Sequence, residues 1–509
     1  MSNDAEPGNP NQAIPFSAFL STFKSQLVHL FHTRENINRL SIHRGIPPFI
    51  FRDIMATNPF SVAIPSRYGG RGGKIDESLS LMEAASYESL ALSLTLGINI
   101  ALFLQPFSKY GDESIKSSVF SGFLKDQKMG GLMITEPDHG SDALHMQTNY
   151  TKERDHYHIK GTKHWAGLTG WADYWLLTAR HKTSSGVLAR DIDFFLCDVN
   201  KAGQQIVVEE KFNNLGLYII PYGRNRIDVM VPVVHRLQPQ TTGVKLMLDL
   251  LHHSRMMMPG TGLGFIKRNL DEAILHTRER KVGGKPLLSF DQVQSRIANI
   301  QAAYTICSAM CVYSSENAAT ESDLAAHGFE ANVIKTVVSD LMQESAQSLL
   351  QLTGAKGYKL DHVAGRGTVD SRPFQIFEGS NDILYFQITE SVIKAMKHNK
   401  EHSLFNFLKT HPVMVRAAEY VKSITQLDPA INISQRKQVE LGRAIARIFS
   451  LGLVLDLGDL GFRRELTDSA IDMLKQEIGA ILETYRYNTS SMVVEDFRED
   501  GEWRSFLRN

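Results

Sequence analysis

The spacing of apolar residues divides the chain into three regions with different periods. Residues 13–128 repeat apolar side chains at helical spacing, and prolines and a glycine cluster at 69–73 interrupt them as loops do. Between 129 and 240 the period shortens to alternating or β-branched runs typical of strands, which are 191–196, 205–208 and 226–231. Helical spacing then returns and continues towards the end. We therefore expect a small β domain between helical ones.

The region after Gln240 has the pattern of long amphipathic helices. One apolar face is formed by residues at helical spacing: Ile297, Ile300, Tyr304, Cys307 and Cys311. Such helices joined by short loops predict a bundle. A chain of 509 residues exceeds the usual size of a single core, so several domains are expected. We place them at 1–128, 129–240, 241–396 and 397–509.

Composition narrows the classes of protein. Lys plus Arg and Asp plus Glu both number 55, so net charge gives no reason to expect nucleic acid or an anionic membrane. Three cysteines cannot form a disulfide framework and favour a reducing, cytoplasmic location. The first twelve residues lack the basic start and apolar core of a signal peptide. Residues 90–107 resemble a membrane span, but polar residues interrupt them, so we predict a buried helix.

The clearest chemical signal is the segment 374–382, FQIFEGSND. A single carboxylate, Glu378, stands among large apolar side chains, and Gly379 then allows the backbone to approach a ligand closely. Burial beside Ile376 and Phe377 would raise the carboxyl pKa towards neutrality, where a general base works best. An acid favoured by the dipole of the following helix would occupy the same position. The residues alone leave both interpretations open.

Two glycine-containing segments of the β region could meet a polar or flat ligand. Residues 133–142, MITEPDHGSD, run from an apolar strand into a turn that offers hydroxyls and amides. Residues 160–173, KGTKHWAGLTGWAD, place Trp165 beside small residues, where its indole can lie against a flat ring. A plain connecting turn and a core tryptophan are the structural alternatives.

Two further patterns suggest sites that we do not expect. His156, His158 and His164 lack a third ligand or carboxylate at a convincing spacing, so no metal site is predicted. The glycines of 260–264, GTGLG, follow no strand and therefore do not form a dinucleotide fingerprint. We expect these glycines to allow close packing between helices.

Together these segments resemble the acyl-CoA dehydrogenase family, over about residues 15–396. Residues 370–381 are similar to the catalytic-base segment of that family, 133–142 to its Thr-Glu-Pro and Gly-Ser-Asp signature, and 160–173 to its Gly-x-Lys-x-Trp pattern. The resemblance implies an α+β, mainly α fold. It comprises an N-terminal helical domain, a middle β-barrel or sandwich domain, a C-terminal four-helix bundle and, here, an additional helical segment.

The resemblance also implies FAD as cofactor and assigns roles to residues. Glu378 would be the catalytic base. Substrate contacts would come from Gly140, Ser141, Arg255 and Gly379. Cofactor contacts would come from Thr135, Trp165, Gly167, Arg280, Gln292, Gln351, Gly354 and Ser380. Arg280 and Gln292 would hold the FAD pyrophosphate across a subunit interface, where cations and amides suit a phosphate.

Several positions depart from the family pattern, among them Gly283 and Ala355, where a phenylalanine and a glycine are usual. His139 stands where a small residue is usual. Gly167 stands where a threonine hydroxyl meets flavin N5, so this contact would come from the backbone, from water or from Thr169. Ser254 occupies a position where some relatives carry their catalytic glutamate, which leaves Glu378 as the base consistent with the family.

The activity implied by the resemblance is α,β-dehydrogenation of an acyl thioester, from acyl-CoA to trans-2-enoyl-CoA, in fatty acid and lipid metabolism. Glu378 would remove the α-proton, and flavin N5 would take the β-hydride. The thioester would be carried by CoA or by an acyl carrier protein. An electron-transfer flavoprotein would be the acceptor, and a cofactor shared across subunits implies a homodimer or homotetramer.

Several alternatives stay open. An acyl-CoA oxidase or flavin monooxygenase has the same fold; Gly167 keeps this alternative open, whereas Glu378 argues against a monooxygenase. A non-catalytic flavin-binding member resembling DNA-associated relatives would need a basic C-terminal region. Residues 401–509 hold 14 Lys and Arg against 16 Asp and Glu, so nucleic-acid binding is not expected. The apolar run at 445–457 predicts a helix packed on the core or on a partner subunit, with peripheral membrane contact as the weaker alternative.

Overall fold

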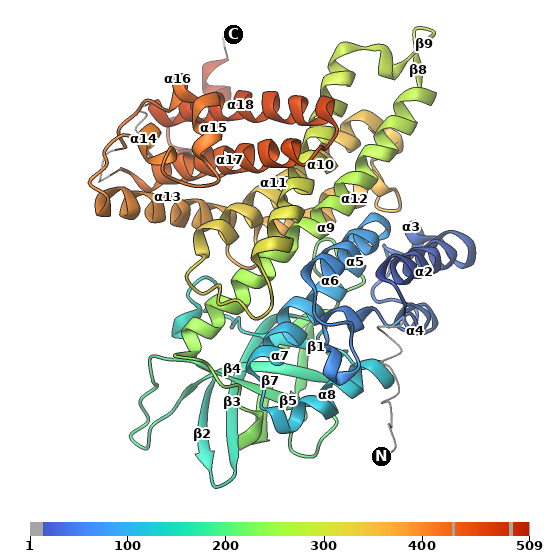
Figure 1. The fold of residues 1–509 in the computed structure, drawn as a ribbon, viewed down its shortest axis with the longest axis vertical. Coiled ribbons are helices and arrows are strands. Elements are labelled where there is room, and N and C mark those ends of the chain that lie inside the picture. The colour runs from blue at the N-terminus through green and yellow to red at the C-terminus, as the bar shows by residue number, and fades with distance from the viewer. Residues whose placement is uncertain (1–13, 430–432, 488–491, 508–509) are drawn as a thin grey trace, which may run out of the picture.

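The computed structural model describes residues 14–429, 433–487 and 492–507, which form helical, β and helical regions in the predicted order (Figure 1). In this view the sheet lies at the bottom, the bundle and the additional helices lie at the top, and the N-terminal helices lie beside their junction. The predicted fold class is therefore confirmed. The exact boundaries at 128, 240 and 396 stay a prediction.

The N-terminal region packs short helices around one apolar helical stretch. Its helices are α2 (Phe16–Val28), α3 (Ile37–Leu40), α4 (Pro48–Met55), α5 (Ile75–Glu88), α6 (Leu90–Asn99), α7 (Gln105–Tyr110) and α8 (Glu113–Lys125). Among the described residues, the stretch Leu90–Tyr110 alone is long and apolar enough to cross a membrane, with a mean hydropathy of 1.7. Because 89% of its most apolar window is buried within the protein, the prediction of a core helix is confirmed.

The middle region is a curled sheet. Its strands are β1 (Gly130–Met133), β2 (Asn149–Glu153), β3 (His156–Gly167), β4 (Tyr174–His181), β5 (Asp193–Asp198), β6 (Val207–Lys211) and β7 (Tyr222–Pro232). They follow the order β1-β4-β2-β3-β7-β6, with β5 paired to β4. The three strand patterns of the sequence correspond to β5, β6 and β7. The antiparallel register of β3 and β7 sets Gly167 opposite Tyr222.

The bundle consists of α9 (Gly243–Glu279), α10 (Asp291–Asn317), α11 (Gly328–Thr353), α12 (Val363–Ser371) and α13 (Asn381–His398), with the two short strands β8 (Lys281–Val282) and β9 (Lys285–Pro286) between α9 and α10. Close packing by the GTGLG glycines is confirmed. A Cβ at Gly260 would meet the backbone of Leu79, and one at Gly264 would overlap the carbonyl oxygen of Glu83, both on α5. The expected apolar face of α10 is buried too: Ile297, Ile300 and Cys307 are each at most 5% exposed.

The middle region fixes the start of α9. The Asp191 carboxylate accepts the N–H groups of Gly243 at 3.1 Å and Val244 at 3.0 Å, and Thr242 Oγ1 accepts that of Lys245 at 3.2 Å. These bonds satisfy N–H groups that a helix leaves unpaired in its first turn. Gly243 has no Cβ, which lets the helix approach the backbone of Ile192. The orientation of α9, which carries Arg255, is thereby tied to the sheet.

The segment after residue 396 is helical, as predicted, and packs on the bundle. It contains α14 (Leu404–Leu408), α15 (Val415–Tyr420), α16 (Lys422–Thr425), α17 (Gln435–Asp459) and α18 (Arg464–Arg486). Helix α17 contacts α13, α10 and α11, and α18 contacts α10. The apolar run at 445–457 is buried in these contacts, with Ile445, Ile448 and Leu451 each 0% exposed. This run is therefore core and offers no surface to a membrane.

At Gly442 the additional segment packs closely against the bundle. A Cβ at this position would overlap the carbonyl oxygen of Tyr385 on α13. We expect Gly442→Ala to lower the free energy of unfolding by about 1–3 kcal/mol, the usual range for overpacking. Gly479 on α18 has no heavy atom within 4 Å of an added Cβ, so Gly479→Ala should instead stabilise by up to about 1 kcal/mol. Equal effects in denaturant titrations would contradict this packing.

Candidate active site

A cavity of about 430 Å³ lies between the sheet and the bundle. One wall comes from the ends of β1, β3 and β7 and the loop after β1, and the other from α6, α9 and the start of α13. Eight of the residues predicted from the sequence line it: Thr135, Gly140, Ser141, Trp165, Gly167, Arg255, Glu378 and Gly379. The structure thus brings the expected base, the substrate-contact residues and the first part of the cofactor shell to one place.

Glu378 stands in a short loop between the turn Arg372–Gln375 and α13, as predicted. Its backbone is left-handed, with φ 53°, and Gly379 follows with φ 91°. Carboxylate oxygen Oε1 accepts a hydrogen bond from Ser254 Oγ at 2.9 Å. Oxygen Oε2 is buried and has no hydrogen-bond partner among the described residues. A buried carboxylate with one free oxygen is arranged to accept a proton from a ligand.

Two buried cations hold the backbone of this loop. Arg255 Nη2 donates to the carbonyl oxygen of Glu378 at 2.7 Å, and Lys335 Nζ donates to that of Gly379 at 2.8 Å. Arg255 is 7% exposed and Lys335 is 0% exposed. Because both cations bond to carbonyl oxygens, they fix the unusual backbone without a hydrogen bond to the carboxylate itself.

Burial raises the pKa of the Glu378 carboxyl, although Arg255, the Ser254 hydroxyl and Lys335 each lower it. Desolvation disfavours the charged form, and here it outweighs the neighbouring cations. Burial also lowers the pKa of Lys335 to about 7, with the Glu378 carboxylate opposing this shift. The site therefore holds an acid with a raised pKa beside a base with a lowered one.

Sequence reasoning missed two of these partners. Ser254 was noted only because it replaces the catalytic glutamate of some relatives. In the structure it donates a hydrogen bond to Glu378. Lys335 was not singled out at all. It stands in the run 333–338, VIKTVV, where a lone lysine among apolar residues is a signal of a buried charge.

The sheet wall of the cavity has an irregular strand. A bulge in β3 between His164 and Ala166 sets Trp165 apart, with φ 56°, and leaves its side chain 50% exposed. Its ring centroid lies 4.6 Å from that of Phe212. The hydroxyl of Thr135 and the indole N–H of Trp165 have no hydrogen-bond partner among the described residues. This wall therefore offers a flat face and free polar groups to a ligand.

Gly167 also lines this wall, and its small size has a structural reason. A Cβ there would lie 2.8 Å from Ile98 Cδ1 and 3.4 Å from Tyr222 Cε1, so a larger residue would require the end of the Ile98 side chain to move. The expectation that Thr169 could supply the missing hydroxyl is wrong. Thr169 is 0% exposed, donates to the Ala166 carbonyl at 2.7 Å and accepts from Asn225 at 3.0 Å. Tyr222, which was missed, has a cavity-lining hydroxyl with no hydrogen-bond partner among the described residues.

Five predicted cofactor residues do not line the cavity. Ser380 precedes α13 and is half-buried. Arg280, Gln292, Gln351 and Gly354 are exposed at the far end of the bundle, where α9 and α11 end and α10 begins. At 1.5 Å per residue, Arg280 stands roughly 37 Å along α9 from Arg255. Within one chain these residues form a separate group, whose cofactor role stays a prediction.

The three histidines contact carboxylate or aromatic side chains of the protein. His158, on the β2–β3 hairpin, contacts Asp228 at 2.7 Å and Glu153 at 3.2 Å. His156 contacts Asp155 at 2.9 Å, and His164 packs against Phe212. Across the ranges that the structure describes, no group of three or more metal-ligating side chains is found.

Comparison with known proteins identifies the family to which the chain belongs. The family models of the acyl-CoA dehydrogenase N-terminal, middle and C-terminal domains match residues 32–126, 131–229 and 241–393. Together they match more than half of the chain, so the chain belongs to the acyl-CoA dehydrogenase family. The predicted family, its oxidoreductase and flavoprotein class and its cofactor, FAD, are confirmed at the level of the family.

Individual relatives are distant. A glutaryl-CoA dehydrogenase from Desulfococcus multivorans is 26% identical over 349 residues, which are 67% of this chain and 87% of the relative. The structure of an acyl-CoA dehydrogenase complexed with FAD from Bacillus anthracis has a TM-score of 0.76 and 17% identity, and the likeness covers 95% of this chain and 90% of that one. The fold likeness therefore extends past residue 396. The prolyl acyl carrier protein oxidase AnaB has a TM-score of 0.64 and 17% identity, covering 73% of this chain and 98% of its own.

The raised pKa of Glu378 makes the stability of the protein depend on pH. Above the unfolded pKa, the folded state holds a proton that the unfolded state has lost, so wild-type stability should fall as pH rises through the folded pKa. Relative to Glu378→Gln, the loss should be about 1.4 kcal/mol for each unit by which the folded pKa exceeds the unfolded one. Urea titrations from pH 4 to 8 on both proteins measure this difference. A wild type that gains stability relative to the variant would show a lowered pKa.

Proposed function

We propose that this chain is an FAD-dependent dehydrogenase of acyl thioesters in which Glu378 removes the substrate α-proton. The observation that carries this proposal is that Glu378 lines the cavity and that its buried oxygen Oε2 has no hydrogen-bond partner among the described residues. Ser254 donates a hydrogen bond to the other oxygen, Oε1, which leaves Oε2 to accept the α-proton. The raised pKa favours a strong base once the proton has been lost, as general-base catalysis near neutral pH requires.

The same loop supplies a group to polarise the thioester carbonyl. The N–H of Glu378 donates to no acceptor among the described residues, whereas its own carbonyl oxygen is occupied by Arg255. A fixed N–H beside the base can stabilise the negative charge that develops on a carbonyl oxygen as the α-proton leaves. Arg255 and Lys335 hold this N–H in place through the two neighbouring carbonyls.

The sheet wall fits the isoalloxazine ring of FAD. Trp165 offers a flat surface, Gly167 presents no side chain, and the polar groups of Thr135, Trp165 and Tyr222 have no partner among the described residues. When bound, FAD would supply the acceptor for the β-hydride. These residues would orient the ring across the cavity from Glu378. Because Gly167 has no side chain, the hydroxyl of Tyr222, its partner on β7, would take the place of the missing threonine hydroxyl.

The four predicted cofactor residues at the far end of the bundle are consistent with an oligomeric enzyme. Arg280, Gln292, Gln351 and Gly354 are exposed and lie far along the bundle from the cavity of their own chain. We infer that they serve the FAD of a second copy, as the family resemblance implies, and that the enzyme is a homodimer or homotetramer. CoA or an acyl carrier protein would carry the acyl group. An electron-transfer flavoprotein would be the acceptor and the cytoplasm the location.

A second candidate is an acyl thioester oxidase, in which oxygen reoxidises the flavin. Gly167 favours it, because the family's usual hydroxyl at that position is missing. The fold likeness to an acyl carrier protein oxidase is consistent with this candidate but shows the fold alone. Both candidates use Glu378 in the same way and differ only after the flavin is reduced.

The test is an anaerobic visible spectrum of the purified protein during titration with saturated acyl-CoAs of graded length. Wild type should bleach with at least one chain length. Glu378→Gln should keep its FAD but be reduced about a thousandfold more slowly, the usual contribution of a general base. Glu316→Gln, on the exposed face of α10, is the matched control and should behave as wild type.

The outcomes separate the candidates. Reoxidation in seconds by air would favour the oxidase, and slow reoxidation in air with rapid transfer to an electron-transfer flavoprotein would favour the dehydrogenase. Bound flavin that acyl-CoA and acyl carrier protein thioesters both fail to bleach would refute the proposed reaction.

A further inference from the structure

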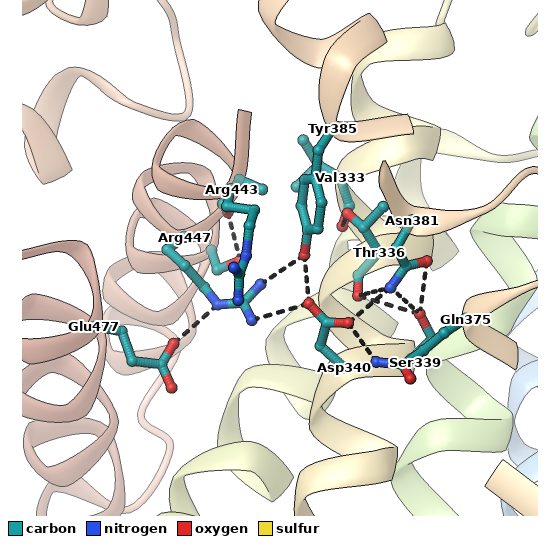
Figure 2. A network of polar contacts seen from close by, with 12 residues as sticks. Val333, Thr336, Ser339, Asp340, Gln375, Asn381, Tyr385, Arg443, Arg447 and Glu477 are labelled. Atoms are coloured by element: carbon teal, nitrogen blue, oxygen red, sulfur yellow. Dashed lines mark hydrogen bonds and ion pairs between the residues drawn. The ribbon is translucent and has the colours of Figure 1, made fainter. Parts of the chain in front are cut away.

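A buried polar network joins the additional C-terminal segment to the loop of Glu378 (Figure 2). At its centre is Asp340 on α11, which is 7% exposed. On one side lies Arg447 of α17, and on the other lie Gln375 and Asn381, which stand at the two ends of the loop. The network therefore crosses from the segment after residue 396 to the base.

One oxygen of Asp340 ties the two ends of the loop together. Oδ1 accepts from Gln375 Nε2 at 2.7 Å and from Asn381 Nδ2 at 2.7 Å. Gln375 stands three residues before Glu378, and Asn381 stands three residues after it. Lys335 Nζ then donates to Asn381 Oδ1 at 2.8 Å as well as to the Gly379 carbonyl. The loop is therefore closed at its base by one carboxylate and held at its tip by cations.

The other oxygen of Asp340 faces the additional segment. Oδ2 accepts from the Tyr385 hydroxyl at 2.6 Å and from Arg447 Nη2 at 3.4 Å. Arg447 Nη1 donates to the Tyr385 oxygen at 3.2 Å, and its Nε donates to Glu477 on α18 at 2.9 Å. Arg447 is 2% exposed and, among the described residues, is the one cation in an ion pair with Asp340.

Arg447 is the charged partner of the Asp340 carboxylate on the side of the additional segment. A buried carboxylate without a cation takes up a proton or moves towards water, because desolvation disfavours its charged form. An uncharged Asp340 would be a weaker acceptor for the two amides, since hydrogen bonds to an ionised group are about twice as strong. Burial lowers the pKa of Arg447, but Tyr385, Glu477, Asp340 and Glu344 each raise it, and together they hold it well above its ordinary value. Arg447 therefore stays charged and remains the cation paired with Asp340.

We propose that the segment after residue 396 is part of the machinery of the active site, with Arg447 as a positioning residue that sets the Glu378 loop through Asp340. This inference rests on the proposed function of Glu378. Arg447 touches neither the cavity nor the base. Its effect is carried by the hydrogen bonds that close the loop.

The first test compares Arg447→Met with Arg416→Met in the full-length protein. Arg416 pairs with Asp456 and Asp459 at the surface of the same segment and has no link to the loop, so it controls for the loss of one arginine. Under anaerobic conditions, Arg447→Met should lower the rate of flavin reduction by about ten- to a hundredfold. The acyl-CoA concentration for half-maximal rate should change less than about twofold, and Arg416→Met should leave both unchanged. Equal rates in the two variants would overturn the proposal.

A second measurement does not depend on activity. The stability difference between wild type and Glu378→Gln, followed from pH 4 to 8, is repeated in the Arg447→Met and Arg416→Met backgrounds. If Arg447 sets the loop, its loss exposes Glu378 to water, and the pH dependence of the difference shrinks only in the Arg447→Met background. An unchanged pH dependence would overturn the proposal even if no acyl thioester reduced the flavin.

Arg447→Lys covers the case in which Arg447→Met does not fold. A lysine keeps the charge but cannot bond to Tyr385, Asp340 and Glu477 together, since it lacks the planar fork of the guanidinium group. It should show the same two effects at smaller size. Suppose that Arg447→Met fails to fold and that Arg447→Lys shows the wild-type rate and pH dependence. Arg447 would then be a purely structural residue, and the proposal would be overturned.

Discussion

The site depends on two buried cations that hold consecutive carbonyl oxygens of the Glu378 loop. Arg255 takes the carbonyl of Glu378 and Lys335 takes that of Gly379. A left-handed backbone is unusual for a glutamate and persists only where surrounding contacts fix it. Because the cations bind backbone and not carboxylate, the loop can keep its shape whether the base is protonated or not. The free oxygen of Glu378 and its free N–H follow from this arrangement.

The electrostatics of the site follow from the same division of contacts. Two cations beside a carboxylate would ordinarily lower its pKa, yet burial raises the pKa of Glu378. Arg255 and Lys335 donate to the carbonyl oxygens of the loop, and among the described residues only the Ser254 hydroxyl donates to the carboxylate. Desolvation therefore outweighs attraction. Desolvation also lowers the pKa of Lys335 to about 7.

The sequence predicted the parts of the site that lie within short motifs. Glu378, Trp165 and Thr135 stand in recognisable local patterns, and helical or alternating spacing sufficed for the order of the three regions. Contacts between distant segments could not be predicted in this way. Asp340 and Arg447 are separated by 107 positions, and no periodic pattern links them. Thr169 was considered at the ring because it is close in sequence, whereas its hydroxyl is taken by Asn225, 56 residues away.

The most direct test is the protonation state of the Glu378 carboxyl itself, measured as the infrared difference between wild type and Glu378→Gln across a pH titration. A buried base set by desolvation predicts a protonated carboxyl band that persists above pH 4.5, the ordinary pKa of a glutamate. A band that disappears at or below pH 4.5 would contradict the account. The neighbouring cations, and not burial, would then set the pKa of the Glu378 carboxyl.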